Sequence, residues 1–145
     1  MLLAIDIGNS NVTLGVFQGQ RLRMRAKASV QTRRSADEYA AMFYDLLRLH
    51  GIGREEIDGC ILSSVVPAVT GLVEAAARTV AAVPVLRVGP GMRTGFRIRI
   101  DDPSQLGSDI VADTLAALTE YGAPLVLIDA GTVTTVAAVD ESRTY

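Results

Sequence analysis

The sequence has very few of the residues that build metal clusters and disulfide frameworks. In 145 residues, Cys60 is the single cysteine and His50 the single histidine. One cysteine excludes a disulfide framework and a cysteine-rich metal site, and the apolar residues around Cys60 favour a core position. One histidine excludes a multi-histidine metal centre and an ordinary Ser-His-Asp triad. His50 precedes Gly51, where we expect a helix to end.

Long apolar runs and a strong charge of either sign are also missing. No run of about 18 apolar residues occurs, so we expect no membrane-spanning segment. The first residues contain no basic stretch, so we expect no signal peptide and a location in the cytoplasm. A net charge of -2 gives no reason to expect a nucleic-acid or membrane partner. With 49% hydrophobic residues, the chain has enough material for about one domain with a real core.

Two stretches of the chain share one pattern, and the rest is organised around them. The first is LLAIDIGNSN, which begins at Leu2, and the second is LVLIDAGTVT, which begins at Leu125. Each has four apolar residues, an aspartate, a variable residue, a glycine and then small hydroxyl or amide side chains. Each then returns to apolar residues, which predicts a strand, a tight turn and a returning strand.

The residues of these turns suit phosphate binding. Gly8 and Gly131 permit positive φ and let a ligand approach the backbone. Consecutive N–H groups and short polar side chains suit phosphate oxygens. A carboxylate at the strand end, Asp6 or Asp129, can hold a hydrated cation that neutralises the same phosphates. Ordinary hairpin turns use the same residue types, but the repeat after matching apolar strands favours phosphate binding.

Strands and helices alternate between the two repeats. Residues 21–26 alternate charged and apolar side chains, which predicts a third antiparallel strand whose arginines form a solvated face. Ser35 and Glu38 predict a capping box for a helix that ends at Gly51. Residues 59–66 predict a buried strand, and Pro67 the first turn of the next helix. Residues 85–88 predict a short strand.

Three further features allow both a structural and a functional interpretation. Ser63 and Ser64 end the buried strand, a usual place for ligand contacts and for caps, and we favour caps. The loop of residues 89–95 has three glycines, a proline and Arg93, and is either a long turn or a wrap around an anionic or polar substrate. Asp109 opens a helix that Gly122 closes. It is either a first-turn carboxylate stabilised by the helix dipole or a general base.

Together these segments resemble type III pantothenate kinase, a family of the actin-like ATPase superfamily. The matching segments occur in the family's order across essentially the whole chain: residues 6–11, 63–67, 89–95, 107–109 and 129–135. The resemblance implies an α/β fold. It implies a ribonuclease-H-like (actin-like) domain with a mixed sheet over residues 1–122, followed by the first strands of a second, incomplete domain of the same kind over 123–145.

The resemblance also implies a reaction and the residues that perform it. The reaction is ATP-dependent phosphorylation of pantothenate to 4'-phosphopantothenate, the first step of coenzyme A biosynthesis, with Asp109 as the catalytic base. Asp6 would lie near Mg²⁺, Asp129 would help to bind a monovalent cation, K⁺ or NH₄⁺, and the protein would be a homodimer. The ATP-binding residues would be Asp6, Ile7, Gly8, Asn9, Ser10, Asn11, Val12, Thr13 and Thr132. The pantothenate-binding residues would be Gly91, Arg93, Gly95, Gly107, Ser108, Asp109 and Ile110.

The chain departs from the family pattern at three places. Ile110 stands where an arginine usually follows the catalytic aspartate, which removes a cation. Arg93 replaces the usual lysine and keeps the charge. Family members continue for roughly another hundred residues past the position of Tyr145. Two alternatives stay open: a member without catalysis that acts as an accessory regulator of transcription, or another kinase of the superfamily that acts on a sugar or carboxylic acid.

Overall fold

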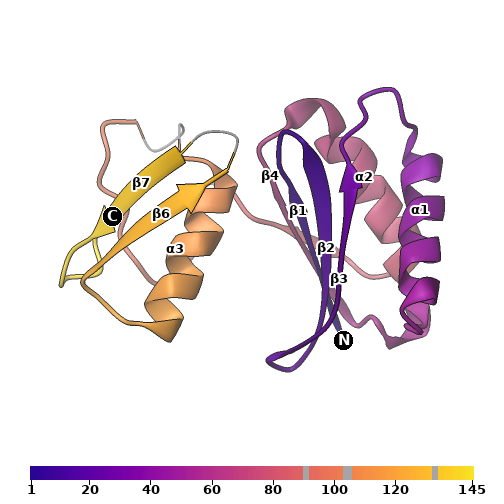
Figure 1. The fold of residues 1–145 in the computed structure, drawn as a ribbon, viewed down its shortest axis with the longest axis horizontal. Helices are drawn as coiled ribbons and strands as arrows, with labels where there is room; N and C mark the ends of the chain where they lie inside the picture. The colour runs from indigo at the N-terminus through magenta and orange to yellow at the C-terminus, as the bar shows by residue number, and fades with distance from the viewer. Residues whose placement is uncertain (90–91, 103–105, 132–133) are drawn as a thin grey trace. The chain divides into compact units, whose positions relative to one another are not determined.

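The computed structural model describes residues 1–89, 92–102, 106–131 and 134–145. These residues form two compact units, Met1–Arg87 and Val88–Tyr145. Figure 1 labels the elements except η1 and β5. The first unit holds β1 (Leu2–Ile7), β2 (Asn11–Gln18), β3 (Arg21–Ser29), α1 (Ala36–Leu49), the short 3-10 helix η1 (Arg54–Glu56), β4 (Gly59–Ser64), α2 (Pro67–Ala81) and β5 (Val85–Arg87). The second holds α3 (Ser108–Glu120), β6 (Leu125–Ala130) and β7 (Thr134–Val139).

The first unit is built on a mixed five-stranded sheet with the order β3-β2-β1-β4-β5. The chain forms β1, β2 and β3 as an antiparallel meander, with Gly19 at φ +59° in the second turn. After α1, strand β4 pairs parallel to β1, and after α2, strand β5 pairs parallel to β4. The strands predicted in residues 59–66 and 85–88 are confirmed as β4 and β5, and β1 is the central strand of the sheet.

Helix α1 begins where the sequence predicts a capping box. The Ser35 hydroxyl accepts a hydrogen bond from the Glu38 backbone N–H at 3.2 Å, and the Glu38 carboxylate accepts one from the Ser35 N–H at 2.6 Å. These bonds lower the pKa of Glu38, the backbone bond to Ser35 most. The helix ends at His50, followed by Gly51 at φ +68°, a conformation in which a residue with a Cβ is strained. The predicted capping box and helix end are confirmed.

Replacement of Ser35 by alanine is expected to destabilise the first unit by about 1 kcal/mol, because the first turn of α1 loses its capping acceptor. Urea unfolding followed by far-UV circular dichroism would measure the loss as a lower midpoint. Ser35→Thr keeps the hydroxyl and is the matched control. An alanine variant with the midpoint of the unchanged chain would contradict the role of the cap.

The core of the first unit lies between one face of the sheet and the two long helices. Alternate residues of the central strands are buried: Leu3, Ile5 and Ile7 of β1 and Val12, Leu14 and Val16 of β2 are each at most 2% exposed. Figure 1 shows α1 and α2 side by side against the sheet. Cys60 belongs to this core, and burial raises the pKa of its thiol to about 11, so the predicted core position is confirmed. The other face carries the side chains that alternate with the buried ones, and we call it the open face.

Strand β3 differs from its predicted pattern because it contains a bulge opposite Val16 and Phe17. Simple alternation would place Leu22 with Met24 on the buried face. The bulge instead pairs Leu22 with Phe17, and Leu22 is 48% exposed while Met24 is 2% exposed. An extra residue in one strand reverses the faces of the residues on either side of it, so Leu22 is exposed together with Arg21, Arg23 and Arg25, whose predicted exposure is confirmed.

The second unit contains the predicted hairpin and the helix before it. Strands β6 and β7 pair antiparallel, and α3 packs against β6. Ala137 and Val139 are buried on one face of the hairpin, whereas Val126, Ile128 and Val136 on the other face are 65–69% exposed. The backbone of Arg97 pairs with that of residues 143–145, which ties the segment before α3 to the turn after β7.

Asp140 organises that turn and predicts a dependence of stability on pH. Its carboxylate accepts hydrogen bonds from the Ser142 hydroxyl at 2.7 Å, the Ser142 N–H at 2.8 Å and the Thr144 N–H at 3.0 Å. The Ser142 hydroxyl lowers its pKa most, followed by the Thr144 N–H, and Arg97 contributes. Because the folded pKa lies below the ordinary value of 3.8, the stabilisation is present above that pH and is lost as the pH falls through the folded pKa.

The difference in melting temperature between the unchanged chain and Asp140→Asn is therefore expected to be constant at neutral pH and to shrink below a pH of about 4. Thermal unfolding of both proteins along a pH series would measure it. A difference that grows as the pH falls would contradict the assignment.

The sequence and the contacts divide the chain at different places. The contacts place α3 with the second hairpin, after a boundary at Arg87. The division into 1–122 and 123–145 rests on the repeat of the two hairpins and stays a prediction. No helix in the described parts of the chain is long and apolar enough to span a lipid bilayer.

Candidate functional site

The first predicted phosphate-binding turn connects the two central antiparallel strands. The Gly8 N–H donates to the Asn11 carbonyl at 2.9 Å and closes the turn, while Asn9 and Ser10 are exposed at its tip. Gly8 would permit positive φ, but it is not among the glycines that adopt it. A Cβ at Gly8 would meet only the Asn11 carbonyl oxygen, at 3.7 Å. The glycine therefore leaves room at the backbone, as ligand approach requires, without relieving strain.

An oxygen-rich row of residues lies just below this turn on the open face. Asp6 pairs with Thr13 of β2 on one side and with Ser63 of β4 on the other. Asp6 is exposed, Thr13 is half-buried and Ser63 is 7% exposed. Hydroxyl and carboxylate oxygens are the ligands that Mg²⁺ prefers, so this row suits a cation held between protein and phosphate.

Ser64 has a structural role but does not cap α2 as the sequence favoured, since the N-cap is Val66 and has no side-chain cap bond. Its hydroxyl accepts from the Val66 N–H at 3.1 Å and lies 2.7 Å from the Thr70 hydroxyl, which donates to the Val66 carbonyl at 2.8 Å. These bonds shape the turn into α2, whose first residue is Pro67 as predicted. Ser64 therefore supports the strand end that carries Ser63.

The second predicted turn repeats the first in one detail that the sequence pattern does not specify. In both hairpins the aspartate pairs with a threonine of the returning strand, Asp6 with Thr13 and Asp129 with Thr135. Asp129 is exposed. Thr132, predicted to contact ATP, lies outside the described residues. The two hairpins thus present the same carboxylate and hydroxyl at the mouth of a turn.

The predicted pantothenate site falls in the second unit. Gly107 is the N-cap of α3, and Ser108, Asp109 and Ile110 form its first turn. One carboxylate oxygen of Asp109 accepts from the Ile110 N–H at 2.8 Å, and Asp109 is half-buried. Arg93 and Gly95 are exposed in the preceding loop, with Gly95 at φ +77°. Gly91 lies outside the described residues. The predicted place of Asp109 in the first turn of α3 is therefore confirmed.

A ready-made metal cage is absent from the described ranges, where no three His, Cys, Asp or Glu side chains gather. Mg²⁺ in phosphotransfer sites is usually held by one or two carboxylates together with substrate phosphates and water. Asp6 with Thr13 and Ser63 fits that kind of site. Asp129 and Thr135 offer carboxylate and hydroxyl oxygens, the ligand type of hard cations.

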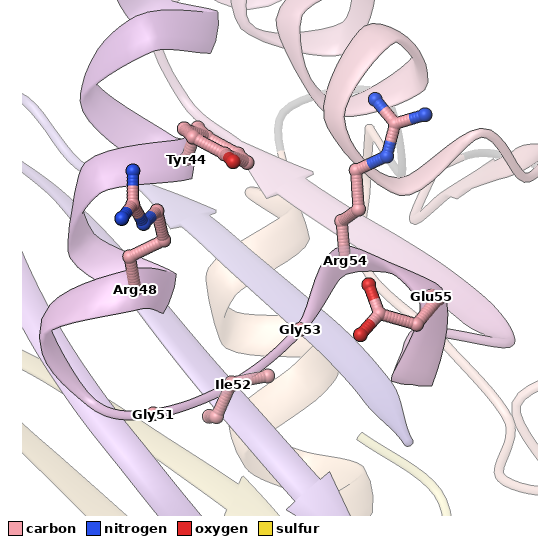
Figure 2. Close-up of a pocket in the computed structure, with 7 residues that line it drawn as sticks. All are labelled: Tyr44, Arg48, Gly51, Ile52, Gly53, Arg54 and Glu55. Atoms are coloured by element: carbon pink, nitrogen blue, oxygen red, sulfur yellow. The ribbon is translucent and has the colours of Figure 1, made fainter.

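Two hollows among the described residues lie away from the predicted site residues. Figure 2 shows a shallow cavity of about 410 Å³ in the first unit, lined by Tyr44, Arg48, Gly51, Ile52, Gly53, Arg54 and Glu55. The cavity residues of η1 precede β4 in the chain, so this cavity lies beyond the amino end of β4. Asp6 and Ser63 lie near the carboxyl ends of their strands. A second hollow of about 450 Å³ is lined by Ile100, Asp101, Asp102, Leu106 and Tyr145. Neither contains a predicted site residue.

Comparison with known proteins identifies the family. The family model for type III pantothenate kinase matches residues 2–145. The chain belongs to the type III pantothenate kinase family. The type III pantothenate kinases of Rubrobacter xylanophilus and a Roseiflexus species are 43% and 41% identical over 145 residues. The chain spans 55% and 57% of the lengths of these relatives.

A solved structure has a similar fold. The ROK hexokinase from Thermus thermophilus superposes with a TM-score of 0.53 at 15% identity, over 98% of this chain and 46% of the hexokinase. At that identity the likeness concerns the fold alone. The predicted fold class, a mixed-sheet α/β domain of the actin-like ATPase type, is confirmed.

Proposed function

We propose that this chain carries the nucleotide- and pantothenate-binding part of a type III pantothenate kinase, which phosphorylates pantothenate with ATP in the first step of coenzyme A biosynthesis. The observation that carries the proposal is the pair of hairpins with a matching Asp–Thr pair, Asp6–Thr13 and Asp129–Thr135, within a chain of this family. In the actin-like ATPase superfamily, each of two domains contributes one hairpin that binds ATP phosphates, so a pair of hairpins is expected.

The chemistry assigned to the residues is in-line phosphoryl transfer. The turn after β1 binds the phosphates through backbone N–H groups and the exposed side chains of Asn9 and Ser10. Asp109 accepts the proton of the pantothenate hydroxyl while that oxygen attacks the γ-phosphorus, and ADP leaves. Positioning and neutralisation of charge supply most of the rate in such reactions.

The cations have defined places in this proposal. Asp6 with Thr13 and Ser63 would hold Mg²⁺, and Asp129 with Thr135 would hold K⁺ or NH₄⁺. A bound Mg²⁺ neutralises charge on the phosphate oxygens. The homodimer, which the family resemblance implies, and the cytoplasmic location expected from the sequence belong to the same proposal.

Release of ADP from ATP, Mg²⁺, K⁺ and pantothenate would test the function. We expect release that requires pantothenate and is stronger with K⁺ than with Na⁺. Turnover on a sugar in place of pantothenate would favour another kinase of the superfamily. Binding of ATP without turnover on any small substrate would favour a regulatory member of the family, in line with Ile110.

A chimera separates the length of the chain from its residues. In it, residues 1–145 of this chain would replace the matching 145 residues of the Rubrobacter xylanophilus relative. If the chimera is active and the 145-residue chain by itself is not, the rest of the relative supplies something that activity requires. If the chimera is inactive and Ile110→Arg restores its activity, Ile110 is the cause. If the chimera is inactive with and without Ile110→Arg, the proposed function is contradicted.

A further inference from the structure

The turn expected to hold ATP phosphates has no cation of its own. Residues 6–13 contain Asp6 and no lysine or arginine, so this segment is negative. Phosphate sites gain much of their strength from charge-assisted hydrogen bonds with lysine or arginine. A cation for the bound phosphates must therefore come from outside residues 6–13.

The register of β3 places a lysine beside this turn. Lys27 pairs with Thr13, and Thr13 pairs with Asp6, so the three residues lie in one row across the sheet. Two strand spacings separate Lys27 from Asp6, which is roughly 10 Å between backbones. Strand β3 also reaches the turn itself, because the Val30 N–H donates to the Ser10 carbonyl at 3.0 Å.

Lys27 also lies on the correct face of the sheet. Met24 pairs with Val16 on the face covered by the helices, and alternation past the bulge places Lys27 on the opposite face. That is the open face, which also carries Asp6 and Thr13. Lys27 is exposed and takes part in no ion pair with another described residue. Its ammonium is therefore free to meet an anion, and its flexible four-carbon stem allows it to reach one.

The segment around Lys27 is strongly basic in a chain that is acidic overall. Residues 18–36 contain six cations and no aspartate or glutamate: Arg21, Arg23, Arg25, Lys27, Arg33 and Arg34. Arg23 donates to Gln18, and Arg34 lies over the Tyr39 ring. Lys27 is the cation of β3 nearest the turn in the register, whereas Arg21 pairs with Gln18 at the far end of the strand. Charges along an edge strand also discourage aggregation, and that role makes no distinction between Lys27 and Arg21.

We propose that Lys27 contacts a phosphate of the ATP bound at the turn between β1 and β2, and supplies the cation that the turn lacks. The proposal rests on the proposed function, because it takes that turn as the phosphate site. Its distinctive consequence is that Lys27 acts on the phosphates alone, so that the affinity for ATP depends on it and the affinity for adenosine does not.

The test compares three variants of the full 145-residue chain: Lys27→Gln, Lys27→Arg and the control Arg21→Gln. Dissociation constants for ATP and for adenosine would be measured by calorimetry with Mg²⁺, and repeated along a salt series. We expect Lys27→Gln to weaken ATP binding about tenfold or more, as loss of a charge-assisted contact does. We expect Lys27→Arg to restore most of the affinity, Arg21→Gln to bind as the unchanged chain does, and Lys27→Gln to show a weaker salt dependence.

The results that would overturn the role of Lys27 differ from the result that would overturn the turn as a phosphate site. Equal ATP affinity in Lys27→Gln and the unchanged chain would overturn the role of Lys27 and leave the proposed function intact. Equal weakening by Lys27→Gln and Arg21→Gln would also overturn it, in favour of a diffuse basic surface. Absence of ATP binding by the unchanged chain would overturn the turn as a phosphate site, and this proposal with it. Circular dichroism of each variant would verify that the fold is kept.

Discussion

Replacement of Asp109 by asparagine is expected to lower pantothenate-dependent ADP release by a factor of about 10²–10⁴, the usual contribution of a general base. Asparagine has the size of aspartate, and its amide oxygen can still accept the Ile110 N–H bond that Asp109 accepts at 2.8 Å. The substitution therefore keeps the first turn of α3 and removes the group that takes the proton. A steady-state assay of ADP release at saturating ATP would measure it, on this chain or on the chimera described above.

The matched control is Asp113→Asn, one turn further along α3, where the side chain is exposed. It removes one negative charge from the same helix and should change the rate little. A rate loss that is equal in both variants would assign the effect to the charge of the helix. An Asp109→Asn protein as active as the unchanged chain would contradict the role of Asp109.

Replacement of Phe43 by alanine is expected to destabilise the first unit by about 3–5 kcal/mol, because it empties the space of a fully buried aromatic ring. Phe43 is 0% exposed, and its ring lies 6.1 Å from that of Tyr39 in a tilted arrangement. Domains of this kind have total stabilities of about 5–15 kcal/mol, so the loss is a large part of the whole. Urea unfolding would measure it.

The neighbouring aromatic residue is the control. Tyr44 follows Phe43 in the chain but is 41% exposed, and the Arg48 guanidinium carbon lies 5.6 Å from the centre of its ring. Tyr44→Ala should therefore cost less than about 1 kcal/mol. Similar losses for the two variants would contradict the division of α1 into a buried and an exposed side.

Features that depend on neighbouring residues in the sequence were predictable. The capping box of Ser35 and Glu38, the helix end at Gly51 and the helix start at Pro67 each depend on residues within one turn. The two Asp-x-Gly turns were found because the pattern recurs. In each case the residue type has a local reason to prefer one backbone conformation, so the sequence contains the needed information.

Features that depend on pairing between distant strands were not predictable. The row of Lys27, Thr13, Asp6 and Ser63 requires the antiparallel register of β3 and the parallel register of β4. The bulge in β3 reversed the face of Leu22, and no residue type in the sequence marks it. The cations of β3 were interpreted as a solvated face for this reason. A basic run with no acidic residue, next to a predicted phosphate-binding turn without a cation, is the signal that could have pointed to Lys27.

A map of backbone amide chemical shifts during titration of the chain with ATP and Mg²⁺ would locate the phosphate site. We expect the largest shifts at Gly8, Asn9, Ser10 and Asn11, with further changes at Asp6 and Lys27, and little change around the cavity at Arg48 and Arg54. Shifts centred on that cavity, or no shifts at the turn when ATP binds, would contradict the assignment of the turn between β1 and β2 as the phosphate site.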